Sequence, residues 1–571
     1  MEPDKRIEQL LTTYLVRDNH AASDYFGLIR ELLQVKMTNP SAQTYIDQVY
    51  GLVEDEIISN QGLPVNEINF GTSGWRGTLG KDVFLKSVGS VTEAIVDLYK
   101  LADSDPDLHP HLGVNSFEEA RQRGCLVGWD NRFGGEILGR CVADTLLKHG
   151  FKVYFCGEST TGVLSASLLE LQAAFSVNLT PSHNPLDYGG YKYNAADGGP
   201  AASQLTSFIT DKSRERIDGA AEIETVGISG GGELIEIDSF ALWQQLVDSS
   251  KEVHRIDYRA LIEQVADHPD MEVVIDSVHG ASRLHIKRLL GPAVNKLEHL
   301  RGEPDVTFGG IAPEPSSKNM SMVTERLQKS QKNLKIGAII DPDADRIRFT
   351  DGTSEISMNQ FGAMAYHFLH EYKKLNGMVA KTVATSNLAN SVAATLGEEL
   401  FETKVGFKEF KPVIGKALVY FEESDGISVI GHTPEKDAYI GLLLALDMVV
   451  ATGRNLSEIK RQMDDIYGEF YPDRDGVLVS LKGDDLLKAL AGLEKYEVGS
   501  TVKVGSREKT IKEIISKDGR KMIFEDDSWL MIRPSGTEPK VRFYVESRDP
   551  DGTTLLVEAA KSMLSEIGLL D

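Results

Sequence analysis

The chain has 571 residues, of which 41% are hydrophobic, and its formal net charge at pH 7 is −25. This length exceeds one ordinary core and predicts about three to five domains. The negative charge argues against nucleic acid as a partner, and it repels an anionic small molecule unless a local basic pocket reverses the field. We also expect no membrane partner, because the chain has no run of about 18 apolar residues and no signal-like start. Three cysteines without metal or redox spacing (Cys125, Cys141, Cys156) favour the cytoplasm.

The first 60 residues have a helical pattern. Apolar side chains recur at helical spacing in three groups: Ile7, Leu10, Leu11, Tyr14 and Leu15; Ile29, Leu32 and Leu33; then Tyr45, Val49, Leu52 and Val53. The spacing predicts three helices in an N-terminal helical extension over residues 1–66.

From about Phe70 short apolar strands alternate with helices, which is typical of α/β architecture. Residues 124–130 and 151–155 are predicted strands, with a helix between them over 137–149. The Gly-rich segment 189–199 is interpreted as a functional loop, and 227–232 as a linker. The first α/β domain is placed over residues 67–226.

Three further units follow. Strands are predicted at 272–276 and 335–341 in a second α/β domain (227–355), and at 379–385 in a third (356–471), which also has an apolar helix over 439–451. The last unit, 472–571, is predicted to be a smaller sheet-and-helix domain.

Two motifs indicate phosphoryl chemistry. In Thr180-Pro-Ser-His-Asn-Pro185 a serine stands between two turns, where its hydroxyl can hold a transferable phosphate. Asp341, Asp343 and Asp345 follow a predicted strand at its C-terminal end, where α/β sheets place ligands, and they offer hard oxygens to Mg²⁺. Alone, the first motif is also a common turn, and the second also opens a calcium loop. The calcium interpretation fails because Arg346 and Gly352 stand where an EF-hand needs Gly and Glu.

A basic cluster near the C-terminus is significant because the chain as a whole is strongly acidic. In the segment 533–542, a Ser-Gly-Thr turn can present N–H groups and hydroxyls to a phosphate, while Arg533, Lys540 and Arg542 supply charge. This composition predicts an anion site, although by itself it also fits an exposed turn between two strands.

As an ordered set, five segments resemble the α-D-phosphohexomutases, the phosphoglucomutase/phosphomannomutase family. They are residues 70–77, 180–185, 341–346, 422–426 and 533–539. The resemblance spans roughly residues 67 to 571 and leaves the extension outside. It implies four domains around one cleft, three of them α/β and the last smaller, each contributing one loop.

The resemblance also implies roles for the residues around the serine. Ser182 would be the phosphoserine, and its phosphate would complete a Mg²⁺ shell made by Asp341, Asp343 and Asp345, with Arg346 beside it. Lys192, with a pKa depressed from its ordinary value, is the candidate general base, together with Arg76. His183 is assigned to holding the loop geometry.

Further roles follow for the sugar loop. The pair Glu422 and Ser424 would contact two adjacent sugar hydroxyls. In the bacterial phosphomannomutase branch a histidine follows this pair, but Gly426 stands here. Lys436, in a phosphoglucomutase-like Glu-Lys-Asp ending, is the candidate second acid/base, and the identity of that group stays open.

The remaining predicted site residues support the serine loop or bind substrate. Asp130 and Arg132 match a strand end of the family and would support the serine loop, whereas Lys408 would reach the substrate phosphate or ring. The other predicted substrate-binding residues are Thr72, Ser73, Arg533, Ser535, Gly536, Thr537 and Arg542.

The predicted function is that of a Mg²⁺-dependent isomerase that moves a phosphate between C1 and C6 of a hexose, with glucose 1,6-bisphosphate as activator. Glucose phosphate is predicted as the preferred substrate over mannose phosphate because of the Lys436-Asp437 ending. The alternatives are a phosphomannomutase, a phosphopentomutase or a sugar-bisphosphate synthase. From other classes, a phosphatase or a non-catalytic sugar-phosphate sensor stays open, as do protein partners, oligomeric state and the purpose of the extension.

Overall fold

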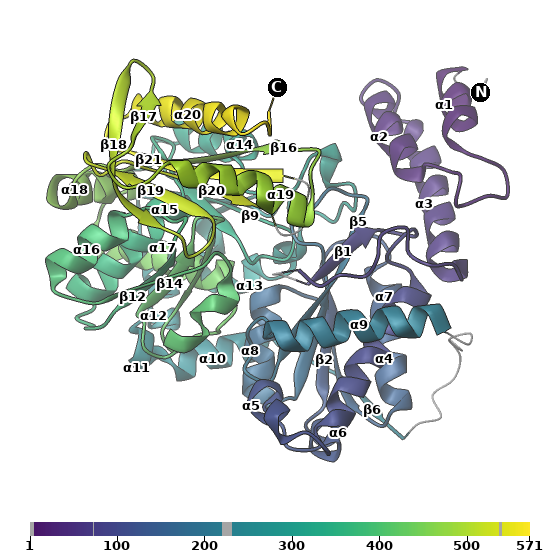
Figure 1. Ribbon diagram of the computed structural model, residues 1–571. Coiled ribbons are helices and arrows are strands. Elements are labelled where there is room, and N and C mark those ends of the chain that lie inside the picture. Colours follow the sequence, from purple (N-terminus) through teal and green to yellow (C-terminus); the bar gives the residue numbers. More distant parts are fainter. Residues whose placement is uncertain (1–4, 72–73, 220–230, 536–539, 571) are drawn as a thin grey trace.

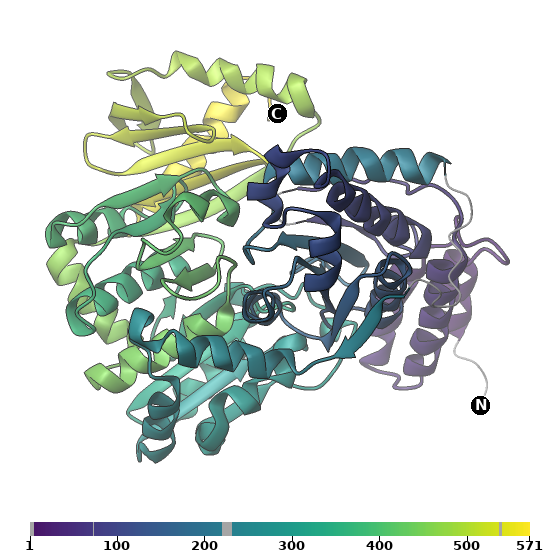
Figure 2. The same ribbon diagram turned by 90° about the horizontal axis from the view of Figure 1, so that it is seen from below.

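The computed structural model describes residues 5–71, 74–219, 231–535 and 540–570. Four sheets with their helices make up residues 75–566, and the N-terminal helices lie at one edge of the molecule, away from the C-terminal sheet (Figure 1). Seen from below, the dark blue segments lie in the middle and right of the molecule, with teal segments at the bottom, green at the left and yellow at the top (Figure 2).

The extension contains the three predicted helices, α1 (Lys5–Tyr14), α2 (Tyr25–Lys36) and α3 (Ala42–Ser59). Their apolar faces belong to the same core as the first domain. The Tyr50 ring lies 4.5 Å from that of Phe133. Arg30 Nη2 lies 2.7 Å from Asp187 Oδ1, in the loop after the predicted phosphoserine. The extension therefore packs against the back of that loop.

The first sheet has the order β1-β5-β4-β2-β3-β6, and its last four strands are parallel. The strands are β1 (Trp75–Thr78), β2 (Cys125–Trp129), β3 (Lys152–Glu158), β4 (Phe175–Leu179), β5 (Tyr188–Ala195) and β6 (Glu233–Glu236). The helices are α4 (Leu85–Leu101), α5 (His109–Leu112), α6 (Phe117–Arg123), α7 (Gly135–Lys148), α8 (Thr161–Leu171) and α9 (Ser203–Gly219). Strand β6 joins this sheet although it lies beyond the predicted boundary at 226.

The Gly-rich segment differs from its prediction as a loop, because residues 188–195 form strand β5 between β1 and β4. Glycine is needed there for close approach: a Cβ on Gly190 would lie 2.3 Å from the Thr180 carbonyl oxygen. Lys192 is consequently fixed on a strand. Most of the predicted linker lies in residues 220–230, outside the described residues.

The second sheet has the order β11-β10-β9-β7-β8, with β9, β7 and β8 parallel. The strands are β7 (Met271–Asp276), β8 (Leu297–Leu300), β9 (Leu334–Ile340), β10 (Ile347–Thr350) and β11 (Glu355–Ile356). The helices are α10 (Ser239–Ser249), α11 (Lys251–His254), α12 (Tyr258–Asp267), α13 (Ile286–Leu290) and α14 (Ser317–Lys329). The two strands predicted here are confirmed.

The third sheet has the order β13-β12-β14-β15. Its strands are β12 (Val379–Thr382), β13 (Leu400–Thr403), β14 (Val419–Glu422) and β15 (Gly426–Val429), with helices α15 (Met358–His367), α16 (Leu388–Leu396), α17 (Ala438–Thr452) and α18 (Leu456–Tyr467). Helix α17 is apolar and buried on nearly every side, as expected for a core helix. Among the described residues no single helix is long and apolar enough to cross a membrane; α17 and α18 would suffice only as a pair, and they are bent by 78°.

The fourth sheet is antiparallel, in the order β16-β21-β20-β19-β18-β17. Its strands are β16 (Tyr471–Leu478), β17 (Thr501–Val504), β18 (Arg507–Ile515), β19 (Arg520–Phe524), β20 (Trp529–Pro534) and β21 (Lys540–Ser547), with helices α19 (Gly483–Leu490) and α20 (Gly552–Glu566). Helix α20 covers one face of this sheet. The other face packs on the third domain through Trp529 and Tyr544 against Val383 and Ala384.

The carboxyl ends of several strands position the site. Asp130 follows β2, Thr180 follows β4, Asp341 follows β9, and Glu422 ends β14. α/β sheets bind ligands beyond the carboxyl ends of their parallel strands. Loops from three domains therefore supply the candidate residues.

Candidate active site

The loop between β4 and β5 holds Ser182 in a left-handed backbone conformation, with φ of 55°. This conformation is costly for a residue with a side chain, and it recurs at functional sites. The Ser182 amide donates to Thr180 Oγ1 at 2.8 Å, and that hydroxyl donates to Asp130 Oδ2 at 2.6 Å. Burial raises the pKa of Asp130 to about 7. The strained turn is thus anchored to the end of β2.

Arg132 holds the same loop from the other side. Its Nη2 donates to the carbonyl oxygens of Ser182 and Asn184, each at 2.6 Å, and its Nη1 donates to that of Pro185 at 2.7 Å. The guanidinium also lies over the Phe308 ring of the second domain, 4.5 Å from its centroid. These contacts support the predicted role of Asp130 and Arg132 in orienting the serine.

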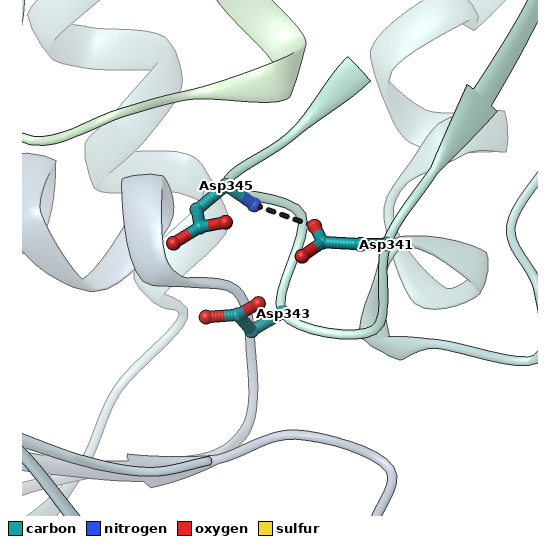
Figure 3. A group of neighbouring side chains, drawn as sticks. All are labelled: Asp341, Asp343 and Asp345. Carbon is teal, nitrogen blue, oxygen red and sulfur yellow. Dashed lines mark hydrogen bonds between the residues drawn. The ribbon is translucent and has the colours of Figure 1, made fainter. Parts of the chain in front are cut away.

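Asp341, Asp343 and Asp345 project toward one another from the turn after β9 (Figure 3), and one oxygen from each lies within 4.8 Å of the others. The amides of Asp345 and Arg346 donate to Asp341 Oδ1 at 3.1 and 3.0 Å, which fixes the turn. Ser182 Oγ donates to Asp341 Oδ2 at 3.0 Å. The two motifs are thereby in direct contact.

The donor set fits a divalent cation. Among the described residues, the buried oxygens Asp343 Oδ1 and Asp345 Oδ1 have no hydrogen-bond partner, which is costly for a carboxylate away from water. Burial and the other two carboxylates raise the pKa of Asp341 well above its ordinary value. Burial also opposes ionisation of Asp345, but Lys192 and Lys436 outweigh it and hold that pKa well below its ordinary value. Hard oxygen ligands are what Mg²⁺ prefers.

Lys192 reaches the same cluster from β5. Its Nζ lies 2.5 Å from Asp343 Oδ2 and 2.8 Å from Asp345 Oδ2. The expectation of a depressed pKa for Lys192 is wrong for this arrangement. Burial alone would lower the pKa of Lys192, but the two carboxylates outweigh burial and raise it.

Lys436 lies between the aspartate turn after β9 and the sugar loop that holds Glu422 and Ser424. Its Nζ is 3.4 Å from Asp345 Oδ2 and 3.3 Å from Glu422 Oε1, and Ser424 Oγ donates to the same Glu422 oxygen at 2.7 Å. Those carboxylates overcome burial and raise the pKa of Lys436. A Cβ on Gly426 would lie 2.2 Å from Lys436 Cδ. The glycine that replaces the phosphomannomutase-type histidine therefore makes room for this lysine.

Two further predicted residues lie around Ser182. Arg76 Nη1 donates to Asn184 Oδ1 at 2.6 Å. His183 Nδ1 lies 3.3 Å from Ser182 Oγ, and burial with the cations Arg346 and Arg76 lowers the pKa of His183 well below its ordinary value. His183 is therefore a neutral imidazole near neutral pH.

The outer residues are spread over a wider surface. Arg533 and Arg542 are cross-strand partners on β20 and β21, and the Ser535 amide donates to the Lys540 carbonyl at 2.8 Å. Lys408 is half-buried and donates to Ser203 Oγ of the first domain at 2.8 Å, so the structure does not bring it to the carboxylates. The predicted residues Thr72, Ser73, Gly536 and Thr537 lie outside the described residues.

Four family models match the chain in order along its length. Phosphoglucomutase/phosphomannomutase alpha/beta/alpha domains I, II and III match residues 111–218, 251–354 and 357–467, and the C-terminal domain matches residues 479–561. The chain belongs to the phosphoglucomutase/phosphomannomutase family. It is an isomerase of the phosphohexomutase type.

Relatives in this family carry different sugar names. A probable phosphoglucosamine mutase of Methanosphaera stadtmanae is 26% identical over 504 residues, covering 87% of this chain and 98% of that protein. A phosphoglucomutase/phosphomannomutase of Thermococcus kodakarensis is 26% identical, covering 78% of this chain and 91% of that protein. The names leave the sugar open.

Solved structures share the fold. A putative phosphomannomutase from Thermus thermophilus aligns with a TM-score of 0.69 at 25% identity, covering 88% of this chain and 99% of that one. An Aspergillus fumigatus N-acetylphosphoglucosamine mutase, solved in complex with GlcNAc-6P and magnesium, aligns at 0.53 with 13% identity, covering 90% of this chain and 98% of that one.

Sequence reasoning missed two residues that the structure brings to the candidate site. Thr161 Oγ1 donates to Asp343 Oδ2 at 2.7 Å, and its amide donates to the Asp343 carbonyl at 2.8 Å. Glu435 lines a pocket with Lys192, Lys436 and Phe407. Thr161 begins α8, shortly after the carboxyl end of the parallel strand β3. Because α/β sheets bind ligands beyond the carboxyl ends of parallel strands, this position could have indicated Thr161 from the sequence. Glu435 has no such local signal.

Proposed function

We propose that this phosphohexomutase interconverts hexose 1-phosphate and hexose 6-phosphate through phospho-Ser182 and a bisphosphate intermediate, with glucose as the preferred sugar. The observation that carries the proposal is the hydrogen bond of 3.0 Å from Ser182 Oγ to Asp341 Oδ2, inside one buried carboxylate cluster. The glucose preference is supported by the fit of Lys436 against Gly426.

Asp341, Asp343 and Asp345 would hold Mg²⁺, together with an oxygen of the phosphorylated serine. When bound, the cation supplies positive charge against the transferring phosphate. The Aspergillus fumigatus relative was solved with magnesium, which supports this assignment. The serine loop is held independently by Thr180 and Arg132, so the chain itself aims Ser182 at the cluster.

The transfers balance in two half-reactions. In the first, the bond from phosphorus to Ser182 Oγ breaks and a bond to the free sugar hydroxyl forms, giving the bisphosphate. In the second, the bisphosphate presents its other phosphate, which returns to Ser182 and leaves the isomer. In each half-reaction the accepting hydroxyl passes its proton to an amine, a form that the raised pKa values of Lys192 and Lys436 make scarce near neutral pH, and the oxygen that releases the phosphate regains a proton from an ammonium group. We assign this exchange to Lys192 and Lys436, and leave their order open.

The fourth domain binds the phosphate that is not reacting. Arg533 and Arg542 face one another across β20 and β21, and guanidinium groups bind phosphate through charge-assisted hydrogen bonds. Because the bisphosphate turns over between the half-reactions, this surface must accept either phosphate.

The test is a mutase assay on glucose 1-phosphate, with mannose, glucosamine and ribose phosphates in parallel. We expect a catalytic amount of glucose 1,6-bisphosphate to reactivate dephosphorylated enzyme, and labelled substrate phosphate to appear on Ser182. Isomerisation without label on the serine would overturn the mechanism. Release of inorganic phosphate would support a phosphatase, and binding without turnover would support a sensor. A cytoplasmic location stays a prediction.

A further inference from the structure

A third arginine lies on the strand next to the Arg533–Arg542 pair. In the register of the fourth sheet, Gly476 of β16 is opposite Arg542, and Arg474 is opposite Tyr544. Opposed residues of antiparallel strands project from the same face, and so do residues two apart along one strand. Arg474, Arg533 and Arg542 therefore share one face of the sheet.

That face is turned toward the third domain. It also bears Trp529, Met531 and Tyr544, which pack on Val383 and Ala384. The residues on either side of Arg474 project the other way, because Asp475 pairs with Lys561 of α20 at 2.9 Å. The alternation Asp473-Arg474-Asp475 thus presents the cation alone toward the third domain.

Arg474 is exposed, and its side chain has no hydrogen-bond or ion-pair partner within the described ranges. It nevertheless acts on two neighbours. It stabilises the ionised form of Glu423, whose pKa is raised by burial and by Glu422. Together with Arg533 and Arg542, it also lowers the pKa of Tyr544, which burial raises. The strand register thus sets Arg474 on the face that bears the arginine pair, and its charge acts on Glu423 of the sugar loop.

We propose that Arg474 is a third phosphate-binding arginine of the fourth domain, which grips the non-reacting phosphate from the side of the sugar loop. The inference rests on the proposed function, because it gives that surface a phosphosugar as its ligand. Arg474 stands two residues farther from the β20–β21 turn than Arg542, an offset of about 7 Å. A flexible arginine side chain can span that offset, and a phosphate dianion has oxygens for three guanidinium groups.

A rival role is an ion pair between Arg474 and Glu423 that fastens the fourth domain on the third without touching substrate. Glu423 accepts from Thr382 Oγ1 at 2.8 Å, so Glu423→Gln keeps a hydrogen-bonding group there. In the rival case Glu423→Gln and Arg474→Ala would have the same effect. For a phosphate ligand, only the arginine change weakens binding.

The experiment measures binding of glucose 1,6-bisphosphate by titration calorimetry, and KM and kcat on the sugar phosphate that the wild type converts. For Arg474→Ala we expect about tenfold weaker binding and a matching rise in KM, with kcat within about twofold. Arg474→Lys should recover part of the affinity because it keeps the charge. Arg507→Ala, an exposed change on β18 of the same sheet, is the matched control and should alter none of the three quantities.

Unchanged affinity in Arg474→Ala would overturn the inference, and so would an equal loss in Glu423→Gln. The outcome is separable from the proposed function because binding needs no turnover. A wild type that binds the bisphosphate without isomerising any sugar phosphate would refute the mutase and leave the arginine testable. An Arg474→Ala variant that keeps the wild-type affinity and KM would refute only the inference, and a wild type that binds no bisphosphate would refute both.

Discussion

Lys192 Nζ lies 2.5 Å from Asp343 Oδ2, so the candidate base and a candidate metal ligand share one contact. The same ammonium group is 2.8 Å from Asp345 Oδ2. A cation bound by these carboxylates must compete with the lysine for their oxygens. The strength of metal binding and the proton affinity of Lys192 are therefore linked.

From this competition we predict that Lys192→Met binds Mg²⁺ more tightly than the wild type while losing turnover. Removing the ammonium leaves three carboxylates with less positive charge nearby, so affinity should rise about tenfold. Calorimetric titration with Mg²⁺ measures it, with the exposed substitution Lys251→Met as control. Equal or weaker binding in Lys192→Met would show that the lysine supports metal binding.

Ser182→Ala should abolish mutase turnover and remove the phosphate from the protein. No other hydroxyl among the described residues hydrogen-bonds to Asp341. Intact-mass measurement should show one phosphate group on active wild type and none on the variant. Ser207→Ala, an exposed serine on α9, should keep both. Full activity in Ser182→Ala would refute the assignment of Ser182 as the residue that carries the transferred phosphate.

Asp343→Asn should fold normally and lose at least about a hundredfold in activity, because one of three anionic ligands is removed. The amide can still accept from Thr161 Oγ1, now 2.7 Å from Asp343 Oδ2. The increase in melting temperature on adding Mg²⁺ should be smaller in the variant than in the wild type. EDTA should abolish the activity of the wild type. Activity that survives the chelator would leave the aspartates as an ordinary acidic turn.

Gly426→Ala should lower kcat, because the added Cβ would lie 2.2 Å from Lys436 Cδ and force the lysine out of place. We expect a loss of about tenfold or more, with a shifted pH–rate profile if Lys436 transfers a proton. Gly51→Ala is the matched control, since nothing lies within 4 Å of its added Cβ on helix α3. An unchanged pH–rate profile with wild-type kcat would exclude Lys436 from the proton transfers.

Folding stability should fall as the pH drops from about 6.5 toward 4, because burial lowers the pKa of both His254 and His285 to about 4. The unfolded chain then binds more protons than the folded one, so acid favours unfolding. Near pH 5 each histidine should reduce the free energy of unfolding by about 2 kcal/mol. Urea titrations between pH 6.5 and pH 4 measure how steeply the free energy of unfolding falls with pH. His254→Gln should reduce this slope, and the exposed His111→Gln should not. Equal slopes in wild type and His254→Gln would refute the assignment.

The sequence by itself determined the elements and the motifs. Helical spacing predicted α1, α2 and α3, and apolar runs predicted β7 and β9, because these patterns record burial of one face or of a whole strand. The order of five short segments pointed to the family that the four domain matches then showed. Such signals depend on residues close together in the chain, so they can be recognised from the sequence alone.

Only the tertiary structure decided which groups share a site and in which charge state. Ser182 and Asp341 are 159 residues apart in the chain, and Thr161 reaches Asp343 only because folding brings together the segments that follow β3 and β9. A general-base role predicts a depressed pKa for Lys192, but folding brings two carboxylates to its ammonium group and raises that pKa. Charge interactions depend on distance through space, and the order of residues along the chain does not contain that distance.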